Sequence, residues 1–415
     1  MAYQRCHSLQ PIATGEAIFR PISTHLRLDI LDVIRGLAVL GILFANIMSW
    51  SGYRFMPYEQ IATLPHYEWD KILYDAFAFF VDTKFYAIFS ILFGVGFYLQ
   101  FQRQQDRESV FLPIYRRRLT ILLLIGMLHA VIWSGDILTL YALVGFVAIR
   151  FRHLAPRTLL LTALGMFASI AVINIILLNM IPGYLTVPPL AHVVFPDMPP
   201  QAVVKTFLTG TLGEVFLLNL HNLWWRWVGF IPSGRPFLVL GLLLLGFYLC
   251  SRDFFRKEAH HGKLLLIFGT AGILFTGSAK FWGGKMDHFP ATWMDIGYKI
   301  LMVAGQVPLA LAYVCLVTWL FRTSMGVKLL HPLSFVGRMA FTNYLVQSVI
   351  GIFLFYTIGL GLVATLGLAQ LYVVTVAICV SQVAGSWLWL RIYRFGPVEW
   401  LWRCLTYRQR FPLRN

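Results

Sequence analysis

The sequence has few charged residues, which make up only 13% of its 415 positions, whereas 58% are hydrophobic. A water-soluble domain normally carries about a quarter charged residues. So little charge excludes an ordinary soluble fold of this size, because the apolar surface is too large to bury in one water-soluble core. A lipid bilayer is therefore the expected solvent for most of the chain.

Two other features are missing. The first 28 residues contain no unbroken apolar core, so we expect no cleavable signal peptide and interpret residues 1–28 as a cytoplasmic tail. The five cysteines show no paired spacing. This pattern speaks against a disulfide framework and against a zinc site, and we predict no metal centre.

Ten apolar runs are long enough to cross about 30 Å of hydrocarbon. They lie near residues 30–50, 72–101, 115–133, 137–150, 157–181, 236–250, 264–281, 296–321, 333–357 and 369–390. These runs predict an all-α fold, a polytopic transmembrane bundle of about ten spans that occupies residues 29–392.

Basic residues are absent from the loop 182–200 and frequent in others. The loops 102–118, 150–157, 251–263 and 322–331 hold 5, 3, 4 and 2 Lys or Arg. The positive-inside rule places these loops, and the tails 1–28 and 393–415, in the cytoplasm. The predicted location is a bacterial inner (cytoplasmic) membrane. The net charge of +16 is then a topology signal helped by anionic membrane lipids, and no nucleic-acid partner is needed to explain it.

Residues 201–235 do not fit this alternation. They join the apolar stretch Val215–Leu220 to a polar, Trp-rich sequence that includes His221 and Arg226. Counting them as a span would move the basic 251–263 loop outside. We therefore interpret them as an external interfacial or re-entrant helix, which extends the external region over residues 182–235.

Ionisable side chains inside a membrane are costly and are functional candidates for that reason. In the first span, Asp32 and Arg35 lie three residues apart and can pair on one helix face. Asn46 follows Arg35 by about three turns and faces the same way. The alternative is a cytoplasmic anchor plus one interhelical hydrogen bond.

The second span begins with Asp82 and Lys84, which do not share a helix face. A break at this DTK sequence would let each side chain meet other helices. Just upstream, on the outside, lies HYEWD with His66, Trp69 and Asp70. A histidine near a carboxylate can act as a general base near neutral pH, although a solvated loop histidine is the simpler interpretation.

The third span contains His129, and Asp136 follows two helical turns later, on the same face if the helix continues. The alternative for His129 is one hydrogen bond to a neighbouring helix. Three consecutive arginines, Arg116, Arg117 and Arg118, precede the apolar part of this span. Such a cluster orients a helix in the membrane, and it also suits a phosphate-rich cosubstrate in the cytoplasm.

The densest polar patch lies in the span 333–357. Arg338 and Thr342 are one turn apart, and so are Asn343 and Gln347, with Tyr344 between them. So many hydrogen-bonding groups indicate a face turned to the bundle interior or to a wet cavity. We interpret it as a pocket wall or pore lining, with helix packing as the alternative.

Several segments resemble the YeiB family of bacterial integral membrane proteins. In chain order between Asp29 and Tyr407 they are LDILDVIRGLAVLGILFANI, KFYAIFSILFGVGFYLQ, RRRLTILLLIGMLHAVIWSGDILTLYAL, GRMAFTNYLVQS and FGPVEWLWRCLTY. The family is distantly similar to the transmembrane acyltransferases, a group that includes the acyltransferase-3 proteins and heparan-α-glucosaminide N-acetyltransferase.

This resemblance implies positions for acyl-transfer chemistry. Acyltransferase-3 proteins carry Arg, ten residues and then His in the first span. Here Arg35 and Asn46 have that spacing, with Asn in place of His. The glucosaminide acetyltransferases have a catalytic His just outside the first span and a Trp three residues later, which His66 and Trp69 match. By the same analogy, Arg116–Arg118 lie on the acyl-CoA side.

The leading hypothesis is an acyltransferase-like protein that moves an acyl group from cytoplasmic acyl-CoA to an acceptor at the outer side of the membrane. Acyl-CoA is a cosubstrate here, and no permanently bound cofactor is expected. Its phosphates would lie near Arg35 and Arg116–Arg118. His66 or His129 would be the base, with Asp136 beside His129, and Asn46 or Asn343 would donate to the developing oxyanion.

Two alternatives stay open. A transporter or channel for a small polar or anionic solute would use the patch from Arg338 to Gln347, together with Asp82 and Lys84, as its lining. A non-catalytic assembly protein would need none of these groups. A haem protein is disfavoured, since only His129 lies plainly within a span. The substrate and the oligomeric state stay open, with a homo-oligomer among the options.

Overall fold

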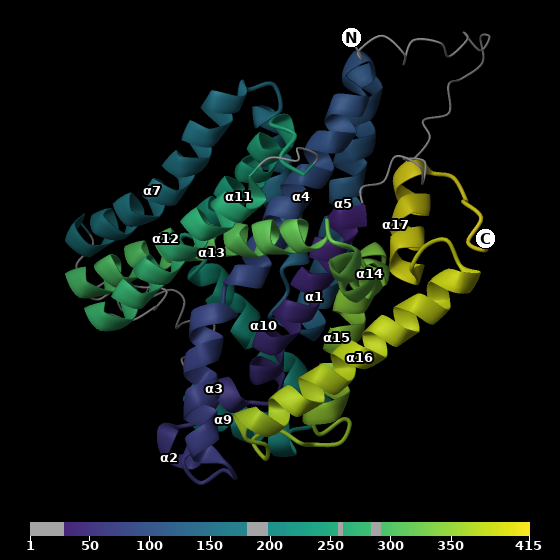
Figure 1. The fold of residues 1–415 in the computed structure, drawn as a ribbon. Coiled ribbons are helices and arrows are strands. Elements are labelled where there is room, and N and C mark those ends of the chain that lie inside the picture. Colours follow the sequence, from purple (N-terminus) through teal and green to yellow (C-terminus); the bar gives the residue numbers. More distant parts are fainter. Residues whose placement is uncertain (1–28, 181–197, 256–259, 284–291) are drawn as a thin grey trace.

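The structure is a computed structural model that describes residues 29–180, 198–255, 260–283 and 292–415. Within these ranges the fold is all-helical, with no strand beyond one isolated bridge between Tyr393 and Arg414 (Figure 1). The predicted all-α class is confirmed. The predicted tail 1–28 and most of the loop 182–200 lie outside the described residues.

The helices divide into two groups along the chain. Those up to residue 180 are α1 Asp29–Trp50, α2 Tyr58–Ile61, α3 Tyr67–Phe80, α4 Lys84–Arg103, α5 Glu108–Ile132, α6 Leu138–Ala148 and α7 Pro156–Met180. Those after residue 197 are α9 Pro200–Thr209, α10 Leu212–Val228, α11 Arg235–Ser251, α12 His261–Trp282, α13 Trp293–Leu320, α14 Ser324–Arg338, α15 Ala340–Phe355, α16 Leu368–Ile392 and α17 Pro397–Tyr407. Many are about twice the 11–12 residues usual in soluble proteins.

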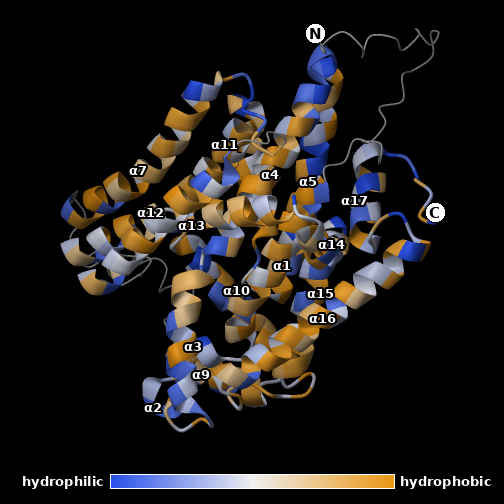
Figure 2. Ribbon diagram, viewed as in Figure 1, coloured by the Kyte–Doolittle hydropathy of each residue, from blue (hydrophilic) through white to orange (hydrophobic). Residues whose placement is uncertain are grey.

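In the described part of the chain, six helical segments are long and apolar enough to cross a membrane. They are α1, α3 with α4 (Tyr67–Arg103), α7, α12, α13 and α16, and the bent pair α14–α15 makes a seventh if it counts as one span. Hydrophobic residues run along these helices, and hydrophilic ones gather around α2 and α17 (Figure 2). The fold is therefore that of an integral membrane protein. The count of ten is not confirmed, because α6 and α11 are short and the 25-residue α5 is not among the candidate spans.

The first span, α1, runs through the middle of the molecule (Figure 1) and packs against α4, α14, α15 and α16. The contact with α14 depends on two glycines. A Cβ atom on Gly36 would lie 2.0 Å from the Leu333 carbonyl oxygen, and one on Gly337 would lie 1.8 Å from that of Asp32. Only glycine allows two helix backbones to approach this closely.

The predicted break at DTK is confirmed. α3 ends at Phe80, α4 begins at Lys84, and Thr83 between them has a φ of +69°. The neighbouring α13 binds the exposed carbonyls of the break, since Gln306 donates to the Thr83 oxygen at 3.0 Å. The fully buried Lys84 donates to the Ala78 carbonyl at 3.0 Å.

The prediction of one continuous helix over 333–357 is wrong. The chain bends by 80° between α14 and α15, so Arg338 and Thr342 are not one turn apart on a shared face. The cause is a cap from the C-terminal region. Glu399 on α17 accepts hydrogen bonds from the backbone N–H of Phe341 at 2.7 Å and of Thr342 at 3.0 Å, which starts a new helix there.

The segment interpreted as one interfacial helix consists of two, α9 and α10, separated at Gly210 and Thr211. Thr211 and Glu214 form a capping box that starts α10. α10 packs against α5 and is anchored by Asn219, whose amide donates to the Ile132 carbonyl at 2.8 Å. This contact places α10 beside the end of α5 and the turn that follows it.

Candidate functional site

Three buried side chains from distant parts of the chain form a hydrogen-bonded row at the C-terminal end of α5. Nδ1 of His129 lies 2.8 Å from Oδ1 of Asp136, and Nε2 of His129 lies 2.9 Å from Oγ of Ser348 on α15. Their exposed fractions are 6%, 4% and 2%. Serine, histidine and aspartate joined in this order form the arrangement that activates a serine oxygen in acyl-transfer enzymes.

The turn between α5 and α6 fixes Asp136. Its two carboxylate oxygens accept hydrogen bonds from the backbone N–H of Leu138 at 3.1 Å and of Thr139 at 2.8 Å, so Asp136 also caps α6. The predicted pairing of His129 with Asp136 is confirmed, although its route differs: α5 ends at Ile132 and a turn returns the carboxylate to the ring. Since Asp136 is an acceptor, the geometry assigns the Nδ1 proton to His129 and leaves Nε2 to accept from Ser348.

Aromatic rings enclose the imidazole. The rings of Tyr344 and Trp133 lie 5.3 and 5.8 Å from that of His129, and the Tyr344 hydroxyl accepts from the Ile137 N–H at 3.3 Å. Tyr344 belongs to the polar patch predicted on the span 333–357. The structure therefore brings part of that patch to His129. Such an enclosure keeps water from the ring and strengthens the electrostatic interactions within it.

Trp50, the last residue of α1, adds an unsatisfied donor. Its ring lies 4.7 Å from that of Trp133 and packs on Gly351, where a Cβ atom would come within 2.4 Å of the indole. Gly351 is one turn after Ser348. The buried indole Nε1 of Trp50 has no hydrogen-bond partner in the described part of the chain. A buried donor without a partner is rare and marks a place where an acceptor is expected.

A second, adjacent face of α15 is also polar, but it is bonded to α16. Asn343 donates to Ser386 at 2.9 Å, Gln347 donates to Gln382 at 2.8 Å, and Gln382 donates to the Asn343 carbonyl at 3.0 Å. All four side chains are buried. These contacts are those of a packed helix interface, which was the alternative interpretation of this patch.

Similarity to other proteins extends over nearly the whole chain. The "Uncharacterized protein YxaH" of Bacillus subtilis (strain 168) is 32% identical, over 98% of both chains. The "Uncharacterized protein YeiB" of Escherichia coli (strain K12) is 28% identical over 92% of this chain and 97% of its own. The chain belongs to the YeiB family. The "Uncharacterized 39.9 kDa protein in amylase 3'region" of Bacillus acidopullulyticus is 28% identical over 95% and 97%.

Residues 249–409 match the family described as "Protein of unknown function (DUF418)". In this YeiB-family protein, that region contains Tyr344 and Ser348, while His129 and Asp136 precede it. The row thus joins the matched region to the first part of the chain. No solved structure matches the chain.

The predicted polar groups of α1 are separate from the row. Arg35 pairs with Asp32 at 2.5 Å, as the spacing predicted. Asn46 is half-buried and makes no side-chain hydrogen bond within the described residues. It lies one turn before Trp50, on the helix that approaches the site, and its predicted role at the oxyanion stays a prediction.

Two of the three arginines of α5 contact α17. Arg117 donates to the Thr406 carbonyl at 3.0 Å, and the Arg118 guanidinium lies 4.1 Å from the centre of the Trp402 ring. Trp402 in turn donates to the Arg118 carbonyl at 2.9 Å. Arg116 is exposed. These contacts explain how α17 is held, and the predicted binding of acyl-CoA phosphates stays a prediction.

The external motif HYEWD has a structural role at one position. Asp70 accepts from the backbone N–H of Leu368 at 2.7 Å and of Ala369 at 2.8 Å, so it caps α16. His66 and Trp69 are exposed, and the His66 side chain forms no hydrogen bond within the described ranges. The spacing shared with the glucosaminide acetyltransferases therefore does not bring His66 into the row.

Reasoning from the sequence missed Ser348, Trp50 and Arg226 in this YeiB-family protein. Ser348 directly follows the predicted Gln347, and its place three helical positions before Gly351 was the signal available. Arg226 lies in the segment that did not fit the topology. Within the described part of the chain, no three His, Cys, Asp or Glu side chains gather as metal ligands.

Proposed function

We propose that this protein is a transmembrane acyltransferase of a bacterial inner membrane, which moves an acyl group from cytoplasmic acyl-CoA to an acceptor at the outer side. The hydrogen-bonded row Ser348–His129–Asp136 carries the proposal. The proposed topology has about ten spans and both termini in the cytoplasm. In it, α5 begins at the basic cytoplasmic side and the row lies toward the outer leaflet.

The first half-reaction transfers the acyl group to the protein. The Ser348 oxygen attacks the thioester carbonyl carbon while His129 Nε2 accepts the serine proton. The new C–O bond forms, the C–S bond breaks, and His129 returns the proton to the CoA sulfur. Asp136 keeps the ring oriented and stabilises the imidazolium during the transfer.

The second half-reaction releases the acyl group to the acceptor. An acceptor hydroxyl or amine attacks the ester on Ser348, His129 accepts its proton, and that proton returns to the Ser348 oxygen as the C–O bond breaks. Each half-reaction places negative charge on the carbonyl oxygen. The unpartnered N–H of Trp50 is the donor best placed to stabilise it, because Trp50 packs one turn from Ser348.

The donor side of the proposal uses basic groups at the opposite end of α5. The CoA phosphates lie near Arg35 and Arg116–Arg118 in this proposal, with Arg116 exposed for contact. Arginine is suited to phosphate because its planar fork donates two parallel hydrogen bonds.

The test uses purified full-length protein and a series of acyl-CoA donors. CoA release is followed by chromatography, because Cys250 and three other free thiols in the described part of the chain would react with thiol reagents. Peptide mass analysis then locates the acyl group. We expect acylation of Ser348, and loss of acylation in Ser348→Ala and His129→Ala.

Ser386→Ala is the matched control. This serine is equally buried and hydrogen-bonded, but it lies against the other face of α15. Equal CoA release by Ser348→Ala and the wild type would refute the acyl-enzyme. The rival function, a solute transporter lined by the α15 patch, predicts no CoA release with any donor.

A further inference from the structure

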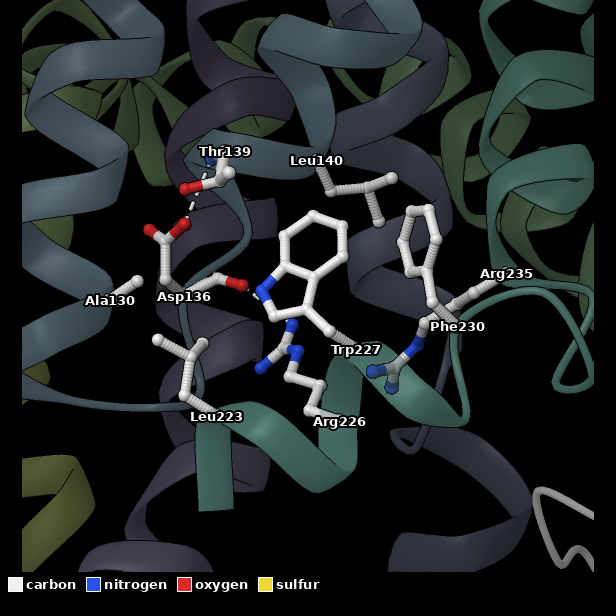
Figure 3. Close-up of a pocket in the computed structure, with 9 residues that line it drawn as sticks. All are labelled: Ala130, Asp136, Thr139, Leu140, Leu223, Arg226, Trp227, Phe230 and Arg235. Atoms are coloured by element: carbon white, nitrogen blue, oxygen red, sulfur yellow. Dashed lines mark hydrogen bonds between the residues drawn. The ribbon is translucent and has the colours of Figure 1, made fainter. Parts of the chain in front are cut away.

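A small pocket adjoins the row on the side away from Ser348. Asp136 and Ala130 form one wall, and the end of α10 and the start of α11 form the other. Figure 3 shows the Trp227 indole between Asp136 and Phe230, with the guanidinium groups of Arg226 and Arg235 on the same side of the ring. Two cations thus share a pocket that begins at the carboxylate of the row.

Arg226 is fixed in place by backbone oxygens. Its guanidinium donates to the Ser134 carbonyl at 2.7 Å and to the Asp136 carbonyl at 2.6 Å, which ties α10 to the turn after α5. Burial, and then the charge of Arg235, lowers the pKa of Arg226 to about 10. The other charged groups that act on it are Asp136 and Arg54. Two arginines therefore line a pocket that contains one carboxylate, and this excess of positive charge favours an anion.

Arg235 is the more available cation. It begins α11 and is half-buried, and its guanidinium forms no hydrogen bond or ion pair within the described residues. The pocket has room for a single water molecule. A larger anion enters only if a side chain moves. The Arg235 side chain can move because no hydrogen bond holds it.

We propose that Arg226 and Arg235 bind a phosphate group of the acyl acceptor, and so hold the acceptor beside the Ser348–His129–Asp136 row. The assignment to the acceptor rests on the acyltransferase function proposed above. A guanidinium donates two parallel hydrogen bonds to a phosphate, and two guanidinium groups surround it. The phosphate belongs either to a lipid headgroup or to a soluble phosphate ester.

Binding is tested without acyl-CoA, on full-length protein. Thermal unfolding is followed as inorganic phosphate or glycerol 3-phosphate replaces chloride at constant ionic strength. Native mass spectrometry then compares retention of phosphatidylglycerol with that of phosphatidylcholine. We expect phosphate to stabilise the wild type. Arg235→Gln should bind at least about tenfold more weakly, since it loses charge-assisted hydrogen bonds.

Lys205→Gln is the charge-matched control, because Lys205 is exposed on α9 and does not line the pocket. It should bind phosphate like the wild type. Arg235→Lys keeps the positive charge but lacks the planar guanidinium, so it should bind phosphate with intermediate affinity. This variant tests the site even if Arg235→Gln does not fold. Retention of phosphatidylglycerol alone identifies a lipid acceptor, and stabilisation by glycerol 3-phosphate identifies a soluble one.

Wild-type affinity in Arg235→Gln, or no binding of any phosphate by the wild type, would overturn the anion site. The two proposals fail separately. Phosphate binding that depends on Arg235, in a protein that releases no CoA, would leave the anion site standing and remove the acyltransferase. CoA release that depends on His129, in a protein that binds no phosphate, would support the acyltransferase and remove the anion site.

Discussion

The two faces of α15 are both polar and buried, yet they differ in what their hydrogen bonds can do. On one face, Ser348 bonds to the imidazole of His129. On the other, Asn343 and Gln347 bond to Gln382 and Ser386 of α16. Burial alone therefore does not separate a site from an interface. The difference is that the first face contacts an imidazole, which can accept a proton at one nitrogen while it donates from the other, whereas the second contacts only amides and hydroxyls.

The largest effect is expected for His129→Ala. Removal of the base should lower the rate of acyl transfer by about 10³–10⁴-fold, the upper part of the range that general acid–base catalysis contributes. The measurement is CoA release per minute at saturating acyl-CoA. The variant should still unfold cooperatively in detergent, because Asp136 keeps its backbone partners. A turnover within twofold of the wild type would mean that the His129 side of α15, like the side packed on α16, has no role in catalysis.

A smaller loss is expected for Asp136→Asn. The asparagine oxygen can still cap α6, but its NH2 group donates and cannot accept a hydrogen bond from Nδ1–H of His129. The wrong tautomer of the imidazole then faces Ser348. We expect about a 10³-fold lower rate with little change in the melting temperature. Asp70→Asn is the matched control, since Asp70 caps α16 without a histidine partner. If Asp136→Asn and Asp70→Asn lose equal activity, Asp136 only stabilises the fold and does not orient His129 for catalysis.

Trp50→Phe should have a smaller effect than either. It keeps the ring packed on Gly351 and removes the indole N–H. Loss of one oxyanion donor typically lowers kcat by about 10²–10³-fold and leaves KM nearly unchanged. The measurement compares kcat and KM of Trp50→Phe with those of Trp133→Phe. Trp133 is a suitable comparison because its ring packs against that of Trp50. A change confined to KM would mean that Trp50 contributes to substrate binding and not to stabilisation of the reacting carbonyl.

The sequence predicted local features well and distant contacts poorly. Hydrophobic runs predicted where helices lie, and the DTK break and the Asp32–Arg35 pair follow from spacing along one segment. Ser348 could not be predicted as the partner of His129, because 219 positions separate them. The bend before α15 was missed for the same reason, since Glu399 causes it from a region interpreted as a tail. Hydropathy carries no information about such caps.

On the second face, Gln382→Leu should change stability and spare catalysis. It removes the acceptor of Gln347 and the donor to the Asn343 carbonyl, which leaves buried polar groups unpaired at a cost of about 1–3 kcal/mol. We expect a lower melting temperature, with the CoA release of the folded fraction near that of the wild type. Ser381→Ala, at an exposed site on the same helix, is the control. A loss of turnover without a loss of stability would assign this face to the site.

The smallest effect is expected at Glu399, which contacts α15 and can titrate, but lies outside the row. Burial is the main influence on this carboxyl, and it raises the pKa of Glu399 above its usual value. A raised pKa means that folding favours the protonated form, so its contribution to stability is full at acid pH and falls as the pH rises through that pKa.

Glu399→Gln keeps an acceptor for the N–H groups of Phe341 and Thr342 and cannot titrate. The melting temperature of the wild type minus that of Glu399→Gln should therefore be larger at pH 5 than at pH 8, with unchanged CoA release. A difference that grows toward pH 8 would mean that the three hydrogen bonds to Glu399 outweigh its burial and hold it as a carboxylate.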